Sequence, residues 1–164
     1  MQDHFARLGL PRRFVVDAAA LERAYLAHSR AVHPDYHAAG AAGDLAASTE
    51  LSAAVNEAYN TLRDPFARAE HLLALLGGPS AAEDKAVEPA FLAEMMDFRE
   101  RIEAGEVEAV RGELADRAAD FEARIAAAFA RVENDANPAH RVAVRKALNA
   151  LKTVRSLARS LPDE

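Results

Sequence analysis

Apolar residues recur at helical spacing along almost the whole chain, and only two stretches interrupt the pattern. Between residues 107 and 132, for example, apolar side chains follow a 3.6-residue period. The breaks are residues 33–43, which begin with His-Pro-Asp, and residues 77–89, which begin with Gly-Gly-Pro-Ser. Alanine, the best helix former, supplies 40 of the 164 residues, whereas the strand-favouring Val and Ile together supply 13. The sequence therefore predicts an all-α chain whose helices form two groups.

Four helices are expected before the second break. The first two cover residues 3–8 and 17–32, and the second of them ends there because a residue that precedes proline disfavours helical geometry. The third starts near Asp44, and the fourth opens at Pro65 behind an aspartate cap. The apolar face of the third helix comprises Leu45, Ser48, Leu51, Val55, Ala58 and Leu62. We expect an antiparallel helical hairpin with short flanking helices over residues 1–76.

Three helices are expected after the second break. Pro89 opens a helix over residues 90–104 that ends at Gly105, the long periodic stretch forms the next, and Asn137-Pro138 opens the last. Amphipathic helices with short connections pack as an antiparallel bundle. We therefore expect a linker over residues 77–88 and a three-helix bundle over residues 89–164.

Composition excludes several classes of function. The chain has no cysteine, so it has no disulfide, no thiolate metal site and no cysteine nucleophile. No apolar run approaches the roughly 20 residues that cross a bilayer, and no signal peptide is evident, so we expect a cytoplasmic protein without a membrane partner. The net charge of −6 argues against nucleic acid as the main partner.

The His33-Pro34-Asp35 sequence lies in the loop between the two long helices of the first group. The plain interpretation is a helix stop followed by a turn. A second interpretation is a metal site of His33, Asp35 and His37, as in a small metal-dependent hydrolase, although no further ligand cluster is indicated nearby. In a third, the proline ring makes a rigid turn that presents the imidazole and the carboxylate to a partner.

Several separated segments resemble a J domain in their order and spacing. They are the opening Asp-His-Phe-Ala-Arg-Leu-Gly-Leu-Pro of residues 3–11, the helix that ends in His33-Pro34-Asp35, and Asn-Glu-Ala-Tyr-Asn-Thr-Leu-Arg-Asp-Pro of residues 56–65. The resemblance implies that residues 1–76 bind a DnaK-type chaperone ATPase and stimulate its ATP hydrolysis. It places the contact on His33, Pro34 and Asp35, with no catalytic residue in this chain.

Charge in the expected partner-binding region departs from the J-domain pattern. The helix over residues 17–32 carries Arg23 and Arg30 but also two carboxylates, and Tyr36 stands where the family commonly has lysine. We expect Asp35 to accept a charge-assisted hydrogen bond from an arginine of the ATPase, and Arg23 and Arg30 to contribute to binding. Electrostatic steering should be weaker than is usual in the family.

The chain resembles one J-domain subfamily more closely, the HscB iron–sulfur co-chaperones. Residues 61–73, Thr-Leu-Arg-Asp-Pro-Phe-Ala-Arg-Ala-Glu-His-Leu-Leu, and residues 91–100, Phe-Leu-Ala-Glu-Met-Met-Asp-Phe-Arg-Glu, carry this resemblance. It implies a two-site adaptor without a cofactor of its own. The J domain would bind an HscA-type ATPase, and the C-terminal bundle would deliver the iron–sulfur scaffold protein IscU. A generic J-domain co-chaperone with another client and a purely structural helical bundle are the alternatives.

The helix over residues 90–104 carries two apolar rows. One row, which includes Phe91, Met95 and Phe98, is sufficient to dock the helix on the bundle. Leu92 and Met96 form the second row, which belongs either to a wide core-facing stripe or to an exposed patch rimmed by charge. The resemblance implies scaffold contacts at Leu92, Ala93, Met96, Asp97, Arg99 and Glu100. Two of these side chains are shorter than the family's, and no aromatic residue lies near residues 148–151, where the family has one.

Overall fold

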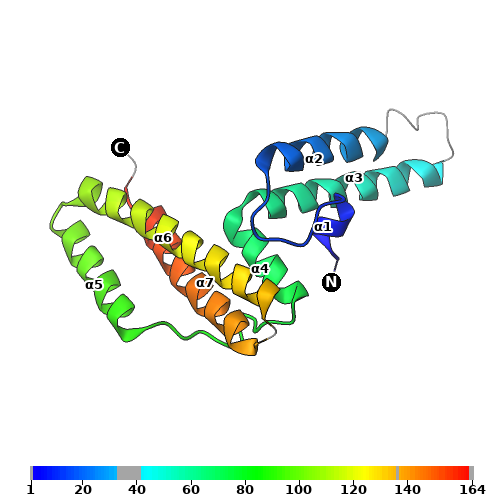
Figure 1. The fold of residues 1–164 in the computed structure, drawn as a ribbon. Coiled ribbons are helices and arrows are strands. Elements are labelled where there is room, and N and C mark those ends of the chain that lie inside the picture. The colour runs from blue at the N-terminus through cyan, green and yellow to red at the C-terminus, as the bar shows by residue number, and fades with distance from the viewer. Residues whose placement is uncertain (1, 33–41, 136, 163–164) are drawn as a thin grey trace. The chain divides into compact units, whose positions relative to one another are not determined.

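The computed structural model describes residues 2–32, 42–135 and 137–162, with side chains from residue 46 onward in the second range. All regular structure in these ranges is helical, which confirms the all-α prediction (Figure 1). The chain divides into two compact units, Met1–Leu75 and Leu76–Glu164. No helix within the described ranges is long and apolar enough to cross a membrane. The helices are α1 (His4–Arg7), α2 (Ala18–Val32), α3 (Ala42–Arg63), α4 (Pro65–Leu75), α5 (Pro89–Glu103), α6 (Val107–Asn134) and α7 (Pro138–Arg159).

The first unit is built around the antiparallel pair of α2 and α3, and α1 and α4 also pack against α3 (Figure 1). Most of the expected apolar face of α3 is buried, including Val55, Ala58 and Leu62. Leu51 is the exception on this face, because its side chain is 48% exposed. Helical spacing decides which face a residue shares, but burial also needs a neighbouring helix at that level. The side chain of Leu45 lies outside the described part.

The expected helix caps are present as hydrogen bonds. Asp17 accepts from the backbone N–H of Ala19 at 2.9 Å, Asp64 accepts from that of Ala67 at 3.0 Å, and Asn137 accepts from that of Ala139 at 2.9 Å. Each cap satisfies a backbone donor that has no partner within its own helix. The short polar residues before each apolar stretch therefore do set where these helices begin.

A pair of histidines packs between α1 and α4. The backbone N–H of His4 donates to Nε2 of His71 at 3.1 Å, and the two ring centroids lie 4.3 Å apart. Both side chains are buried, and the ring of Phe5 stacks on His71 at 5.9 Å. Burial lowers the pKa of His71, and the neighbouring His4 lowers it further. His71 thus serves as a neutral acceptor inside the first unit.

The second unit contains the antiparallel pair of α6 and α7, with α5 packed on α6 (Figure 1). The apolar stripes predicted for these three helices are largely buried, and Phe91 meets Phe121 edge to face with ring centroids 5.5 Å apart. Side chains that supply this core include Met95, Phe98, Val110, Leu114, Ile125, Phe129, Val144, Leu148, Leu151 and Val154.

The segment before α5, which the sequence suggests as a linker, is hydrogen-bonded to α7. The side-chain amide of Asn149 donates to the carbonyls of Asp84 at 3.0 Å and Ala86 at 3.2 Å. The same side chain accepts from Nε of Arg145 at 3.1 Å, and Arg145 is itself only 1% exposed. Asn149 therefore holds this irregular stretch in place just ahead of α5.

Candidate functional site

The end of α2 is held by two serines of α3. The carbonyl of Val32 accepts hydrogen bonds from the hydroxyl of Ser48 at 2.6 Å and from that of Ser52 at 3.0 Å. The last four carbonyls of a helix have no partner within it, so these hydroxyls satisfy an otherwise unpaired group. Val32 immediately precedes the His33-Pro34-Asp35 sequence, which lies outside the described residues, as do Tyr36 and His37. The described part thus fixes where α2 ends, directly before this sequence.

Two tyrosines join α2 to α3. The rings of Tyr25 and Tyr59 stack with centroids 4.2 Å apart. The hydroxyl of Tyr25 donates to Oδ1 of Asn56 at 3.0 Å, and that of Tyr59 donates to Oε2 of Glu22 at 2.5 Å. The hydrogen bond to the Glu22 carboxylate raises the pKa of Tyr59. These contacts set the register between α2 and α3.

Arg23 and Arg30 both lie exposed on α2. Their spacing of seven residues is close to two helical turns, so they share one face of the helix. Arg12 is engaged elsewhere, because its Nε donates to Oδ2 of Asp3 at 2.6 Å. The basic surface that the structure describes on α2 therefore rests on Arg23 and Arg30.

Helix α5 is exposed at every position where the sequence suggests a scaffold contact. Leu92 is 48% exposed and Met96 is 62% exposed, so the interpretation as a wide core-facing stripe is wrong. The reason is that α5 packs on one side only, through its other apolar row. The exposed face, called the outer face below, comprises Leu92, Ala93, Met96, Asp97, Arg99 and Glu100.

Two arginines that sequence reasoning missed tie α5 to α6. Arg101 donates from both Nη atoms to the Glu113 carboxylate at 2.6 and 2.9 Å, and its Nε donates to Glu106 at 2.8 Å. This arginine lowers the pKa of Glu113. Arg117 donates from Nε and Nη2 to Oε2 of Glu94 at 3.1 and 2.5 Å. Ion pairs at two positions along α5 therefore hold the helix that carries the outer face against α6. Charges of opposite sign on facing helices are the sequence signal that indicates such pairs.

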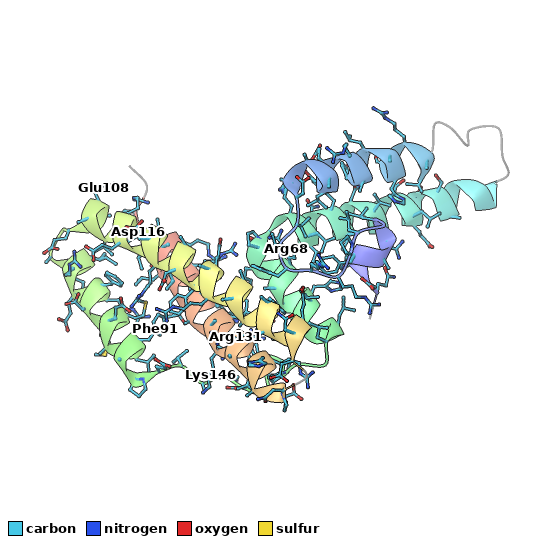
Figure 2. All side chains as sticks on the ribbon, in the orientation of Figure 1. Arg68, Phe91, Glu108, Asp116, Arg131 and Lys146 are labelled. Carbon is cyan, nitrogen blue, oxygen red and sulfur yellow. The ribbon has the colours of Figure 1, made fainter. Side chains whose placement is uncertain are left out.

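A groove of about 640 Å³ opens between α5, α6 and α7. Figure 2 labels Phe91 on α5, Arg131 on α6 and Lys146 on α7, which all line it. Small side chains create the hollow, because alanines stand where larger residues could fill the space. These alanines are Ala90, Ala127, Ala128, Ala143, Ala147 and Ala150. The sequence does not predict the groove. A high alanine content indicates helices, but it does not show where three packed helices leave space between them.

The sequence offers His33, Asp35 and His37 as possible metal ligands. Those three residues lie outside the described ranges. Within the described ranges, no group of three or more His, Asp or Glu side chains is placed to hold a metal ion.

Curated relatives match this chain over most of its length. A protein of Paraburkholderia phymatum is 38% identical over 148 residues, which cover 87% of this chain and 85% of the relative. A protein of Chromobacterium violaceum is 40% identical over 134 residues, which cover 76% and 77% of the two chains. Both are named co-chaperone protein HscB homolog. The chain belongs to the HscB co-chaperone family.

Family models and solved structures agree with this assignment. The model described as the HSCB C-terminal oligomerisation domain matches residues 87–157. The chaperone HscB from Vibrio cholerae superposes with a TM-score of 0.79 at 26% identity, covering 96% of this chain and 94% of that one. The human co-chaperone protein HscB shares the fold with a TM-score of 0.83 at 23% identity, covering 97% and 80%. The resemblance found in the sequence is confirmed.

HscB proteins are co-chaperones and not enzymes, which removes the metal-dependent hydrolase from consideration.

Proposed function

We propose that this HscB-family chain is a cytoplasmic adaptor with two protein-binding sites. His33, Pro34 and Asp35 stimulate ATP hydrolysis by a DnaK/HscA-type chaperone, and the outer face of α5 binds the iron–sulfur scaffold protein IscU. The observation that carries the scaffold half is the exposure of Leu92 and Met96 on a helix whose other apolar row is buried.

The outer face has the chemistry of a protein interface. Exposed apolar side chains at its centre supply buried area when a partner covers them, and charged side chains at the edge supply orientation. Here Leu92 and Met96 form the centre, while Asp97, Arg99 and Glu100 form the edge. The short side chains of Ala93 and Asp97 reduce the contact area, so we expect moderate affinity.

The chaperone half rests on the residues that follow α2. Pro34 restricts the backbone, and Asp35 offers a carboxylate for an arginine of the ATPase. The serine hydroxyls on the Val32 carbonyl hold the helix end from which this sequence departs. Arg23 and Arg30 add positive charge on the same helix and favour an acidic partner surface.

A single chain that carries both sites raises the local concentration of the scaffold near the ATPase. The ATPase would then hydrolyse ATP while its client is present. This coupling gives the two-site arrangement its purpose, which is to assist cluster assembly and transfer.

Two single substitutions test the proposal. His33→Gln should abolish stimulation of the chaperone ATPase in a steady-state assay and leave the Kd for IscU unchanged, because the two sites lie in different units. Met96→Asp should weaken IscU binding at least about tenfold in calorimetry, because a charge replaces a central apolar contact. Val142→Asp is the matched control, since Val142 is also exposed but lies on α7.

If His33→Gln stimulates the ATPase normally, the proposed role of the His33-Pro34-Asp35 sequence in chaperone binding is disproved. If IscU does not bind, or binds equally well to Met96→Asp, the scaffold half fails and a J-domain co-chaperone with another client becomes the better description.

A further inference from the structure

The groove beside α5 combines an apolar floor with cationic edges. Its floor includes the rings of Phe91 and Phe121, which are 7% and 6% exposed, and the methyl groups of Ala128 and Ala150. Arg131 and Lys146 are both exposed at its lining, on α6 and α7 (Figure 2). A hollow of about 640 Å³ is within the size range of ligand-binding pockets.

The charges of the groove are not balanced within it. Of the two carboxylates in the lining, Glu94 is bound by Arg117 and Glu88 is exposed. Arg124, which also lines the groove, pairs with Asp120 at 2.8 Å. No ion pair to Arg131 or Lys146 is found among the residues that the structure describes. In a chain of net charge −6, the two cations make this hollow a local positive site that favours a carboxylate.

The groove and the outer face lie on adjoining sides of one helix. Ala90 and Glu94 line the groove, whereas Ala93 and Asp97 belong to the outer face. Because a helix with its side chains is only about 10 Å wide, one protein partner can contact both sides of α5 at once. A free small molecule would use the groove alone, so this continuity favours a protein segment.

We infer that the groove binds an acidic segment of the same scaffold protein that the outer face holds. A carboxylate of this segment pairs with Arg131 and Lys146, and a small apolar side chain beside it packs on Phe91 and Phe121. The identity of the partner rests on the proposed function, whereas the chemistry of the segment rests on the groove. The scaffold thereby straddles α5 and contacts the bundle on two sides.

Charge reversal in the groove tests the electrostatic half of this inference. The double variant Arg131→Glu/Lys146→Glu is compared with Lys152→Glu/Arg159→Glu, which makes the same change of charge at exposed positions outside the groove lining. Purified IscU is the probe, and Kd is measured by calorimetry at low and high salt. We expect the groove variant to weaken binding about tenfold at low salt and less at high salt, because salt screens the new repulsion, with the control close to wild type at both.

Filling the groove tests the apolar half. Ala147→Leu adds volume in the lining without changing charge, and leucine is a good helix former, so the helix should remain intact. We expect weaker IscU binding, while Ala158→Leu further along α7 serves as the control. Circular dichroism confirms that each variant is folded.

The outcomes separate this inference from the proposed function. If Met96→Asp loses IscU but the groove variants bind it with unchanged Kd, the inference is overturned and the outer face stands. Equal losses in the groove variant and the Lys152→Glu/Arg159→Glu control also overturn it, since net charge alone would then explain them. If IscU binding is insensitive to Met96→Asp as well, the proposed function fails and this inference fails with it.

Discussion

At the scale of one residue, the hydrogen bond that buried His71 accepts depends on the protonation state of its ring. Its Nε2 accepts the backbone N–H of His4, so the neutral ring must carry its proton on Nδ1. Protonation of Nε2 would place one donor against another. Burial and the nearby His4 lower the pKa of His71, while Asp3 and Glu57 oppose this with a smaller effect.

The stability of the first unit should therefore fall as the pH is lowered. The unfolded chain protonates His71 near the ordinary histidine pKa of 6.5, whereas the folded chain resists protonation until a lower pH. The free energy of unfolding is then fully present above that value and decreases below it. Urea denaturation of the whole chain between about pH 7 and pH 5 measures this effect.

His71→Gln is the informative variant, because its amide oxygen can accept the same hydrogen bond and does not titrate. We expect a flatter dependence of unfolding free energy on pH than in the wild type. Parallel curves for the two proteins would show that the other histidines account for the effect.

At the scale of one helix, α5 has one packed side and one exposed side. Phe91 is buried against Phe121, whereas Met96 is exposed on the opposite side. Phe91→Ala should lower the free energy of unfolding by about 3 kcal/mol, because it removes a buried ring and leaves a cavity. Met96→Ala should change that free energy by less than about 0.5 kcal/mol, as is usual for surface positions. Chemical denaturation of both variants checks the contrast, and a similar loss in each would contradict the placement of Met96.

Helix positions and caps could be predicted from sequence because both depend on local chemistry. The spacing of Phe91, Met95 and Phe98 predicts their burial, and Asn137-Pro138 predicts where α7 starts. Contacts between distant residues could not be predicted in this way. The exposure of Leu51 and the hydrogen bonds from Ser48 and Ser52 depend on which neighbour lies opposite.

The candidate site was predictable to the same degree. The two apolar rows of α5 were visible as spacing, but only packing against α6 decides that Leu92 and Met96 face outward. The groove has no signature in the sequence, because its alanines come from three separate stretches. Oppositely charged residues such as Glu94 and Arg117 could have been proposed as a pair, although many other pairings were equally consistent with the pattern.

At the scale of the whole molecule, the chain has two units with separate cores. We therefore expect a cut between them to uncouple the proposed IscU binding from the proposed ATPase stimulation. A protease recognition site inserted between Gly77 and Pro79 allows the chain to be cut after folding. We expect the cut protein to bind IscU with unchanged Kd and to stimulate the chaperone ATPase without IscU as before. The additional stimulation by IscU at low protein concentration should disappear, because the two sites are no longer linked.

The ATPase assay before and after cleavage measures the loss, and the inserted but uncut protein is the control. Gel filtration checks that the two fragments come apart after cleavage. If IscU still increases the stimulation when both separated fragments are present, the two sites do not need a common chain.

The hydrogen bonds from Asn149 to Asp84 and Ala86 also determine how long the connection between the units is. They anchor the chain to α7 only about nine residues after α4 ends, and an extended chain of that length spans at most about 30 Å. The carbonyl of residue 84, and not the start of α5, is therefore the fixed end of the tether. Asn149 therefore shortens the stretch of chain that is free to move between the two units. A side chain outside both proposed binding sites thus limits the separation that the chain allows between them, and we expect Asn149→Ala to lengthen the free connection without changing either proposed site.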